Sequence, residues 1–340
     1  MTKPVTSLLV MMLHEEGKLK LTDPISKWFP QFRSMKVKTG KPGEFENASR
    51  PITIFDLLTH TSGITYGGFL GGDIDSLLTK QEWISALADL PLASHPGDLF
   101  HYGRSTDLLG MLISTLEETS LENAMKEKIF DRLGMTDTFF NLPEHKKSRC
   151  ALNVGYDASG NLVHPEIVPS GMAFKERPAN LEFQSGGQGL WSTADDYLEF
   201  AKLFVQDKNA NQSSIVKPET IEMMCRNHLT LAQREKSKLL GAAIFREHYG
   251  FGLGIAVALK TSAYGSIPCS ASIHSLGWPG AYGGWWSVDP VNKTVGIFLT
   301  HSMTETAQLM QGIGLEVFDA IDVFSKYARV ETGMKLSASK

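Results

Sequence analysis

The chain has 340 residues, with 33 Lys and Arg against 37 Asp and Glu and a formal net charge of -4. Hydrophobic residues make up 42% and charged residues 21%, a balance that supports a substantial core and excludes wholesale disorder. The mild acidity excludes the electrostatic footprint of a nucleic-acid-binding protein. No apolar run approaches the roughly 20 residues that a membrane span requires.

Cysteine and histidine usage predicts neither a disulfide framework nor a metal site. Cys150, Cys225 and Cys269 form no C-x-x-C motif, although one distant pair can still bridge. The ten histidines include no H-E-x-x-H or comparable pair, and no metal or organic cofactor is expected. The apolar N-terminal stretch ends in acidic residues without a small-residue cleavage site. The chain as given is therefore expected in the cytoplasm, with any targeting segment upstream of it.

The first element is predicted to be a helix over residues 4–16, preceding a connection over residues 18–50. Pro4 suits a first helical turn, and Gly17 suits a C-terminal cap. Apolar residues recur at helical spacing along one face, at Val5, Leu8, Leu9 and Met12.

The middle of the chain is predicted to be mostly helical. Thr53 and Asp56 form a capping-box variant that opens a short helix ending near Gly63. The stretch from Gly67 to Gly72 has glycines too irregular for a phosphate cradle and is expected to form a flexible loop near a cleft. Helical periodicity follows over residues 80–90, 106–119, 121–133 and 193–205.

After about Glu247 the pattern changes to strands. Segments 249–259, 281–288 and 294–300 predict strands, with a turn at 289–293 between the last two. A capping box at Ser302 to Glu305 predicts a final helix through Phe324. The layout is that of an α/β protein of the α+β type, with an antiparallel sheet flanked by helices plus a mostly helical lobe.

Three short segments carry the candidate chemistry: Thr2-Lys3, residues 96–105 around Tyr102, and residues 277–285 around Trp278. Taken alone, each has an ordinary interpretation. Lys3 can be a solvated terminal lysine, Tyr102 a packing residue in a loop, and the glycines after Trp278 the mark of a bulged strand.

Together these segments resemble the serine β-lactamase and penicillin-binding-protein-like hydrolases, with the greatest likeness to class C β-lactamases and the family VIII esterases. The likeness runs along nearly the whole chain and includes LLTHTSG at 57–63, LGMTDT at 133–138 and GGQGLWST at 186–193.

The resemblance implies one β-lactamase/transpeptidase-like domain over 1–340. Within it we expect a motif helix over about 1–18 at the lobe junction, a mostly helical lobe over about 19–240, and the antiparallel sheet with a C-terminal helix over about 241–340. It also implies that N-terminal sheet elements precede the motif helix in the family and are missing here.

The first family motif is S-x-x-K, in which serine is the nucleophile. Thr2-Lys3 matches its end, so the serine position lies one residue before Met1 and is absent from the chain. We therefore expect a truncated or wrongly assigned start.

The other two motifs are present in relaxed form. Tyr102 matches the tyrosine of Y-x-N, with Arg104 where the asparagine stands in the family. Trp278 to Gly280 matches the W-x-G variant of the third motif, which points away from an efficient β-lactamase and toward an esterase-like enzyme. The resemblance implies Lys3 and Tyr102 as general bases.

Further site residues follow from the same resemblance. Gly280 and Ala281 are expected to form the oxyanion wall and Trp278 the pocket. His274 lies near the third motif and is a candidate cleft residue, against the default of a structural histidine. Arg104 either binds a substrate carboxylate or pairs with a local acid such as Asp107.

The sequence thus predicts a β-lactamase-related serine hydrolase of esterase type, which acylates its serine with a small ester or amide and is inactive as given because the nucleophile precedes Met1. One alternative is a non-catalytic pseudoenzyme that only binds a ligand, and another is a true class C-like β-lactamase. The substrate and the oligomeric state are left open.

Overall fold

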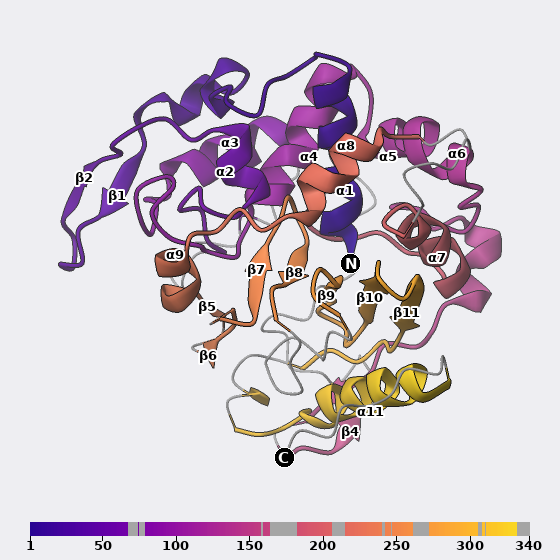
Figure 1. Cartoon of the computed structure of the whole chain (residues 1–340). Helices are drawn as coiled ribbons and strands as arrows, with labels where there is room; N and C mark the ends of the chain where they lie inside the picture. The colour runs from indigo at the N-terminus through magenta and orange to yellow at the C-terminus, as the bar shows by residue number, and fades with distance from the viewer. Residues whose placement is uncertain are drawn as a thin grey trace.

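The computed structural model describes residues 1–66, 74, 79–157, 159–163, 182–205, 215–239, 242–245, 247–260, 272–304, 308–309 and 311–331. Within these ranges, helices cover one side of a five-stranded sheet and a C-terminal helix lies on the opposite side (Figure 1). The loop predicted over 67–72 lies outside the described residues, as does Cys269. No described helix is both long enough and apolar enough to cross a membrane.

The first helix, α1 (Thr2–Glu15), begins next to the sheet and runs away from it through the middle of the helical part (Figure 1). Every residue from Thr2 to Leu13 is buried, although the sequence predicted a single apolar face. The reason is that α4 (Ser105–Leu116) and α8 (Pro218–Cys225) both contact it. A helix that is covered all round belongs to the core. The predicted end is confirmed, because Gly17 has a left-handed φ of 74°.

The predicted helices of the middle segment are confirmed, with ends that differ by a few residues. Thr53 and Asp56 cap α2 reciprocally, as their spacing predicts, but the helix ends at Leu58 rather than near Gly63. Two helices, α8 and α9, lie where the sequence analysis expected none. The remaining elements of this part are α2 (Ile54–Leu58), α3 (Lys80–Asp89), α5 (Leu121–Met125), η4 (Lys126–Phe130), α6 (Asp131–Leu133), α7 (Ala194–Lys202) and α9 (Leu231–Lys236).

Short turns and two-stranded hairpins form the connections. The segment predicted as a connection over 18–50 contains two 3-10 helices and one hairpin. These smaller elements are η1 (Ile25–Lys27), η2 (Pro30–Ser34), η5 (Glu144–Arg149), β1 (Lys36–Lys38) with β2 (Phe45–Asn47), β3 (Gly155–Tyr156) with β4 (Leu162–Val163), and β5 (Lys238–Leu239) with β6 (Ala242–Ala243).

The predicted antiparallel sheet is confirmed, with strand order β11-β10-β9-β8-β7. Strand β10 begins at Trp285 rather than at Ala281, because the backbone from Gly280 to Gly284 turns. The Gly280 N–H donates to the Gly284 carbonyl at 2.7 Å, and Gly283 has a φ of 76°. The strands are β7 (Tyr249–Phe251), β8 (Ala256–Ala258), β9 (Leu276–Pro279), β10 (Trp285–Asp289) and β11 (Thr294–Phe298).

Two adjacent tryptophans of β10 anchor the layers on either side of the sheet. Trp286 packs against aromatic rings of α7, with 5.9 Å between its ring centroid and that of Phe200. Trp285 belongs to a second buried cluster that includes Ile321. Alternate side chains of a strand point to opposite faces, so β10 joins the helical layer to the C-terminal helix.

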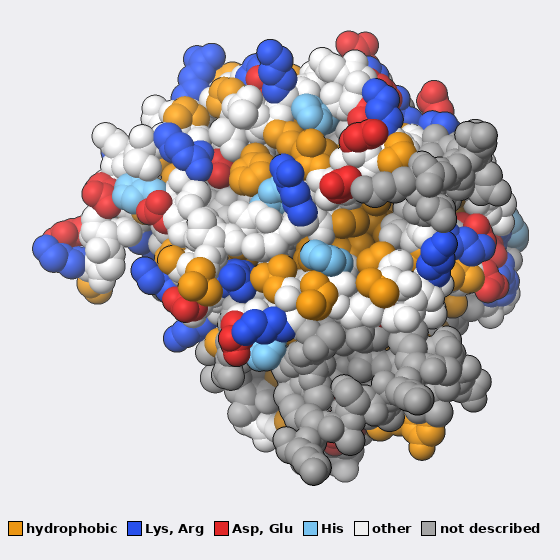
Figure 2. All heavy atoms as spheres, in the orientation of Figure 1, with side chains coloured by type: hydrophobic (Ala, Val, Ile, Leu, Met, Phe, Trp, Pro, Cys, Tyr) orange, Lys and Arg blue, Asp and Glu red, His pale blue; other side chains and the backbone are white. Residues whose placement is uncertain are grey.

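The C-terminal helix begins later than predicted. Gln308 and Leu309 are helical, but residues 311–315 form turns before α11 (Glu316–Glu331) starts. Gly312 and Gly314 have left-handed φ values of 84° and 76°, which interrupt the helical path. In space-filling view, hydrophobic side chains gather across the middle of the face that carries α8 and β7, and charged side chains concentrate toward the rim (Figure 2).

Candidate active site

The site forms around Lys3 in the first turn of α1. Lys3 is buried, and its Nζ donates to Tyr66 Oη at 2.9 Å and to the Gly187 carbonyl at 2.8 Å. Burial opposes the charged form, but the neighbouring Tyr102, Tyr66 and Asp107 together raise the pKa of Lys3 above its ordinary value. Lys3 is therefore a fixed cation at neutral pH.

Tyr102 stands beside Lys3, on the loop that leads into α4. The Lys3 Nζ lies 4.9 Å from the centre of the Tyr102 ring. The ring of His60 lies against the Tyr102 ring with centroids 4.7 Å apart, and the His60 carbonyl accepts the N–H of His101 at 2.8 Å. Burial, and then the charge of Lys3, lower the pKa of His60 well below its ordinary value, so this imidazole supports Tyr102 as a neutral ring.

Trp278 covers another side of Tyr102. Its indole Nε1–H donates to Tyr102 Oη at 2.9 Å, and the two ring centroids are 5.2 Å apart. An indole N–H can only donate, so the Tyr102 oxygen accepts this hydrogen bond. The structure thus brings Lys3, Tyr102 and Trp278 together from three distant segments.

The turn after β9 forms the opposite wall. A Cβ built on Gly280 would lie 3.6 Å from the Met1 nitrogen, so this turn adjoins the start of α1. The Gly280 N–H is taken by Gly284, whereas none of the described hydrogen bonds uses the N–H of the exposed Ala281. The start of α1 therefore lies against the turn after β9.

Arg104 and His274, the other two predicted site residues, differ in their distance from Lys3 and Tyr102. Arg104 is buried rather than solvated, and its guanidinium lies 5.5 Å from the centre of the Tyr66 ring. It lies on the same loop as Tyr102, and carboxylate binding stays a prediction. His274 is exposed in the turn between β8 and β9, with a φ of 73°, and its N–H donates to the Ala258 carbonyl. This turn is at the end of β9 away from Gly280.

Three groups around Lys3 were not assigned a role from the sequence. They are the Tyr66 hydroxyl, the Gly187 carbonyl and the buried carboxylate of Asp107, which accepts a hydrogen bond from Ser185. The sequence contained a partial indication of the Gly187 carbonyl, because GGQG at 186–189 belongs to a family-like segment. A glycine, however, does not indicate that its carbonyl binds a lysine. The sequence suggested Asp107 only as a partner of Arg104.

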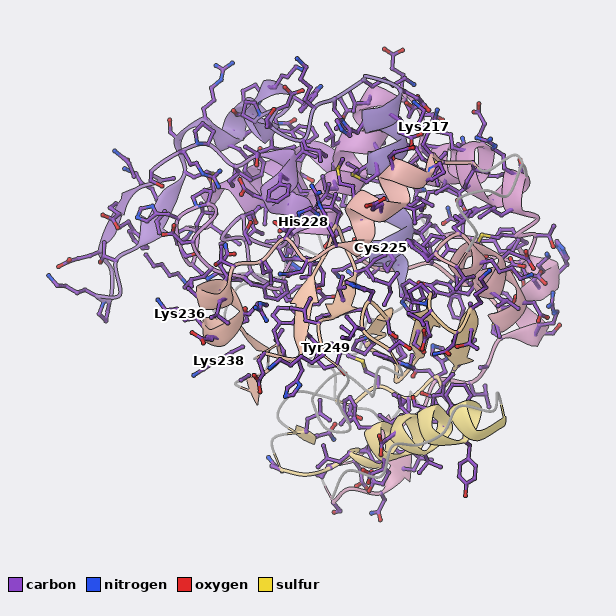
Figure 3. The ribbon with its side chains drawn as sticks, viewed as in Figure 1. Lys217, Cys225, His228, Lys236, Lys238 and Tyr249 are labelled. Carbon is purple, nitrogen blue, oxygen red and sulfur yellow. The ribbon has the colours of Figure 1, made fainter. Side chains whose placement is uncertain are left out.

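Among the described residues, neither Ser7 nor a free cysteine occupies the motif-serine position beside Lys3. Ser7 is one turn further along α1, where a Cβ on Gly254 would overlap its Oγ. Cys225, at the end of α8 (Figure 3), is a free thiol whose pKa burial raises to about 12. Cys150 is also a free thiol. Within the described ranges, no three His, Cys, Asp or Glu side chains gather to hold a metal ion.

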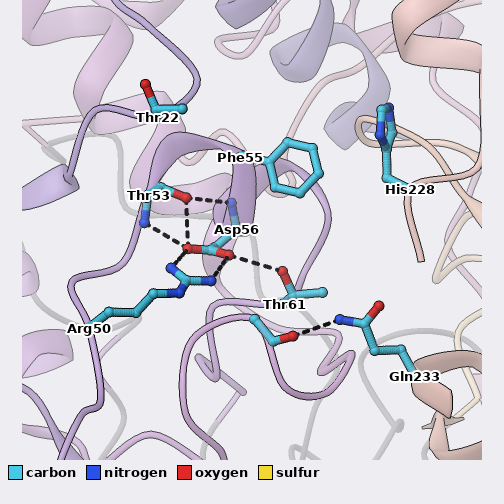
Figure 4. A pocket seen from close by; sticks show the side chains of 9 residues that line it. Thr22, Arg50, Thr53, Phe55, Asp56, Thr61, His228 and Gln233 are labelled. Atoms are coloured by element: carbon cyan, nitrogen blue, oxygen red, sulfur yellow. Dashed lines mark hydrogen bonds and ion pairs between the residues drawn. The ribbon is translucent and has the colours of Figure 1, made fainter. Parts of the chain in front are cut away.

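A cavity of about 410 Å³ lies on the outer side of the turn after α2. Figure 4 shows Arg50 holding both oxygens of the buried Asp56 there, at 2.6 and 2.8 Å, with Thr61 and Thr53 on the same carboxylate. His228 and Gln233 complete the lining. The Asp56 carboxylate thus links Arg50, Thr53 and Thr61 and braces the turn that carries His60.

A family model described as Beta-lactamase matches residues 1–314. The chain belongs to the β-lactamase family. Within it, Protein Rv1367c of Mycobacterium tuberculosis is 35% identical over 309 residues, which span 88% of this chain and 75% of that protein. Esterase EstB of Burkholderia gladioli is 28% identical over 324 residues, which span 89% and 76%.

The fold of this β-lactamase-family chain is also found among solved structures. EstCE1, a hydrolase with promiscuous acyltransferase activity, matches with a TM-score of 0.71 at 23% identity, over 94% of this chain and 83% of that one. The expected β-lactamase/transpeptidase-like architecture is therefore confirmed. A cation, a phenol and a turn meet near the start of α1, and none of the described hydrogen bonds uses the N–H of Ala281 in that turn. An acyl transfer to a serine uses groups of these kinds.

Proposed function

We propose that this β-lactamase-family site performs acyl transfer from small esters, with a serine immediately before Met1 as the nucleophile. The observation that carries the proposal is the 2.9 Å hydrogen bond from Trp278 to the Tyr102 hydroxyl, next to the cation of Lys3. Trp278 places an uncharged indole at the third-motif position where other family members have a lysine. An indole does not attract an anionic β-lactam, so the site favours a neutral ester. The esterase named among the relatives supports the same choice.

The proposed reaction has two steps. The serine oxygen attacks the ester carbonyl while its proton passes to the Tyr102 oxygen, and the oxyanion binds the Ala281 N–H and the N–H of the serine itself. The alkoxide leaves with the proton that Tyr102 returns, which completes the acyl-enzyme. Water or a second alcohol then attacks the acyl-enzyme, again through Tyr102. Lys3 remains charged and stabilises the phenolate form of Tyr102.

A polypeptide of residues 1–340 alone is proposed to lack this covalent route. It contains Lys3 and Tyr102 but no serine at the motif position, and Ser7 lies elsewhere on α1. The rival interpretation is a binding protein that never catalyses. The enzyme and the binding protein are distinguished by adding the serine, which should create activity only in the enzyme.

The test compares three polypeptides: residues 1–340, the same chain extended upstream with the matching segment of a relative that ends in serine, and that extension ending in alanine. We expect hydrolysis of p-nitrophenyl acetate and covalent labelling by a fluorophosphonate only in the serine form. Activity of residues 1–340 or of the alanine form would contradict the assigned nucleophile. An inactive but folded serine form would favour the binding protein, and faster turnover of a chromogenic cephalosporin than of esters would favour the β-lactamase.

A further inference from the structure

The Lys3 ammonium has three N–H donors, and two of them are already directed by this chain. One donates to Tyr66 Oη at 2.9 Å and another to the Gly187 carbonyl at 2.8 Å. A lysine side chain is a flexible four-carbon stem, so the position of its ammonium group depends on the hydrogen-bond acceptors that hold it. Two fixed acceptors leave the third donor with a defined direction.

Tyr66 is itself held in place by a close contact between two loops. A Cβ on Gly103 would lie 2.5 Å from Thr65 Cα, so only a glycine lets the Tyr102 loop lie this near the Tyr66 segment. The rings of Tyr66 and Tyr102 are consequently 6.0 Å apart, on two sides of Lys3. Tyr66 as a residue is 41% exposed, but its hydroxyl end is turned inward to the buried ammonium.

We infer that Tyr66 is a positioning residue of the acyl-transfer site: with the Gly187 carbonyl, its hydroxyl oxygen holds Lys3 so that the remaining ammonium N–H faces the position before Met1. The inference rests on the proposed function and deepens it. A phenol suits this role better than a carboxylate, because it accepts the hydrogen bond without neutralising the cation. Burial, against the pull of Lys3, raises the pKa of Tyr66 to about 12, so Tyr66 stays a phenol while Tyr102 exchanges the proton.

The first test needs no turnover. In residues 1–340 labelled with 15N-lysine, a held ammonium gives a slowly exchanging 1H–15N signal, which Lys3→Arg identifies by its loss. We expect Tyr66→Phe to broaden or abolish this signal, while Tyr327→Phe, a change on the exposed face of α11, leaves it intact. Circular dichroism confirms that both variants fold. An unchanged Lys3 signal in folded Tyr66→Phe would overturn the inference.

The second test uses the serine-extended chain. We expect Tyr66→Phe to lower kcat about tenfold, with KM within twofold, because the group acts on Lys3 and not on the substrate. It should also move the alkaline limb of the pH–rate profile to lower pH, since Lys3 loses an acceptor that favours its charged form. A wild-type kcat and profile would overturn the role. If the extended chain hydrolyses no ester, the proposed function fails, and the ammonium signal still decides whether Tyr66 holds Lys3.

Discussion

The two walls of the site are built differently. On the helical wall, two of the groups beside Lys3 have further close contacts: Tyr102 with Trp278 and His60, and Gly187 with the buried Asp107. On the sheet wall, the turn from Gly280 to Gly284 bulges out of the strands and leaves Ala281 exposed. On its inner side, Gly280 of this turn lies next to the side chain of Met1.

The difference matches what each wall has to do. Proton transfer requires donor and acceptor at hydrogen-bond distance in every turnover, so the groups that move protons need rigid surroundings. An oxyanion donor is a single backbone N–H, and an open turn can present it to acyl groups of different size. Substitutions on the helical wall should therefore cost more than matched ones on the sheet wall.

The largest effect is expected from the proton-transfer groups themselves. In the serine-extended chain, Lys3→Ala and Tyr102→Phe should each lower kcat by about 100-fold or more, the usual scale for positioned acid–base groups. Steady-state hydrolysis of p-nitrophenyl butyrate measures it. Full activity in either variant would show that the helical wall does not transfer the proton.

The second prediction compares a glycine from each wall. In Gly103→Ala the new methyl group would meet the backbone of Thr65, which cannot move aside, so we expect a loss of about 1–3 kcal/mol of unfolding free energy. In Gly284→Ala the nearest atoms are 3.8 Å away, in ordinary contact, and the cost should be smaller. Urea denaturation of residues 1–340 measures both, and equal costs would contradict the rigid and open walls.

A third, smaller effect concerns the bond between the walls. Trp278→Phe keeps a ring over Tyr102 but removes the donor to its hydroxyl. We expect kcat to fall about tenfold, which corresponds to about 1.4 kcal/mol. Trp83→Phe serves as the matched control, because that buried ring lies in the helical core away from the described hydrogen bonds of the site. An equal loss in both would indicate packing and not the hydrogen bond.

The smallest effect is a pH dependence of stability through His60. Its pKa is lower folded than unfolded, so the folded state binds fewer protons, and stability falls as the pH drops below about 6.5. The loss should reach about 1 kcal/mol near pH 5.5. Asparagine tolerates the left-handed φ of 55° at position 60, so His60→Asn is a suitable variant. Its unfolding free energy should depend less steeply on pH than that of the exposed control His145→Asn. Parallel slopes would contradict a neutral, buried His60.

Local patterns predicted most of the helices and the antiparallel sheet, because each of these elements is encoded by a few neighbouring residues. The capping box of Thr53 and Asp56 is one example, and the Trp278 to Gly280 motif is another. The all-round burial of α1 was not predictable from its spacing, since it depends on α8, a helix that begins about 200 residues later. Its Thr6 and Ser7 are buried only because Gly186 and Gly254 approach them.

The rest of the site could not be predicted for a related reason. Tyr66 follows a family-like turn, but its bond to Lys3 depends on the fit of Gly103 against Thr65, a contact between loops. The Gly187 carbonyl is a backbone group, which leaves no residue-type signal. The late start of α11 arises from glycines whose left-handed conformations override an apolar spacing that suggests a continuous helix.

The complete burial of α1 has a consequence for synthesis. This helix is synthesised before the residues that cover it, which come from α4, α8 and the segment around Gly254. Its apolar surface therefore stays uncovered until about three quarters of the described chain has been made. Because the same helix carries Lys3, the Lys3, Tyr102 and Trp278 side chains meet only when these long-range contacts close. We expect the nascent chain to depend on chaperones during that interval, and the site to form in the final cooperative step of folding.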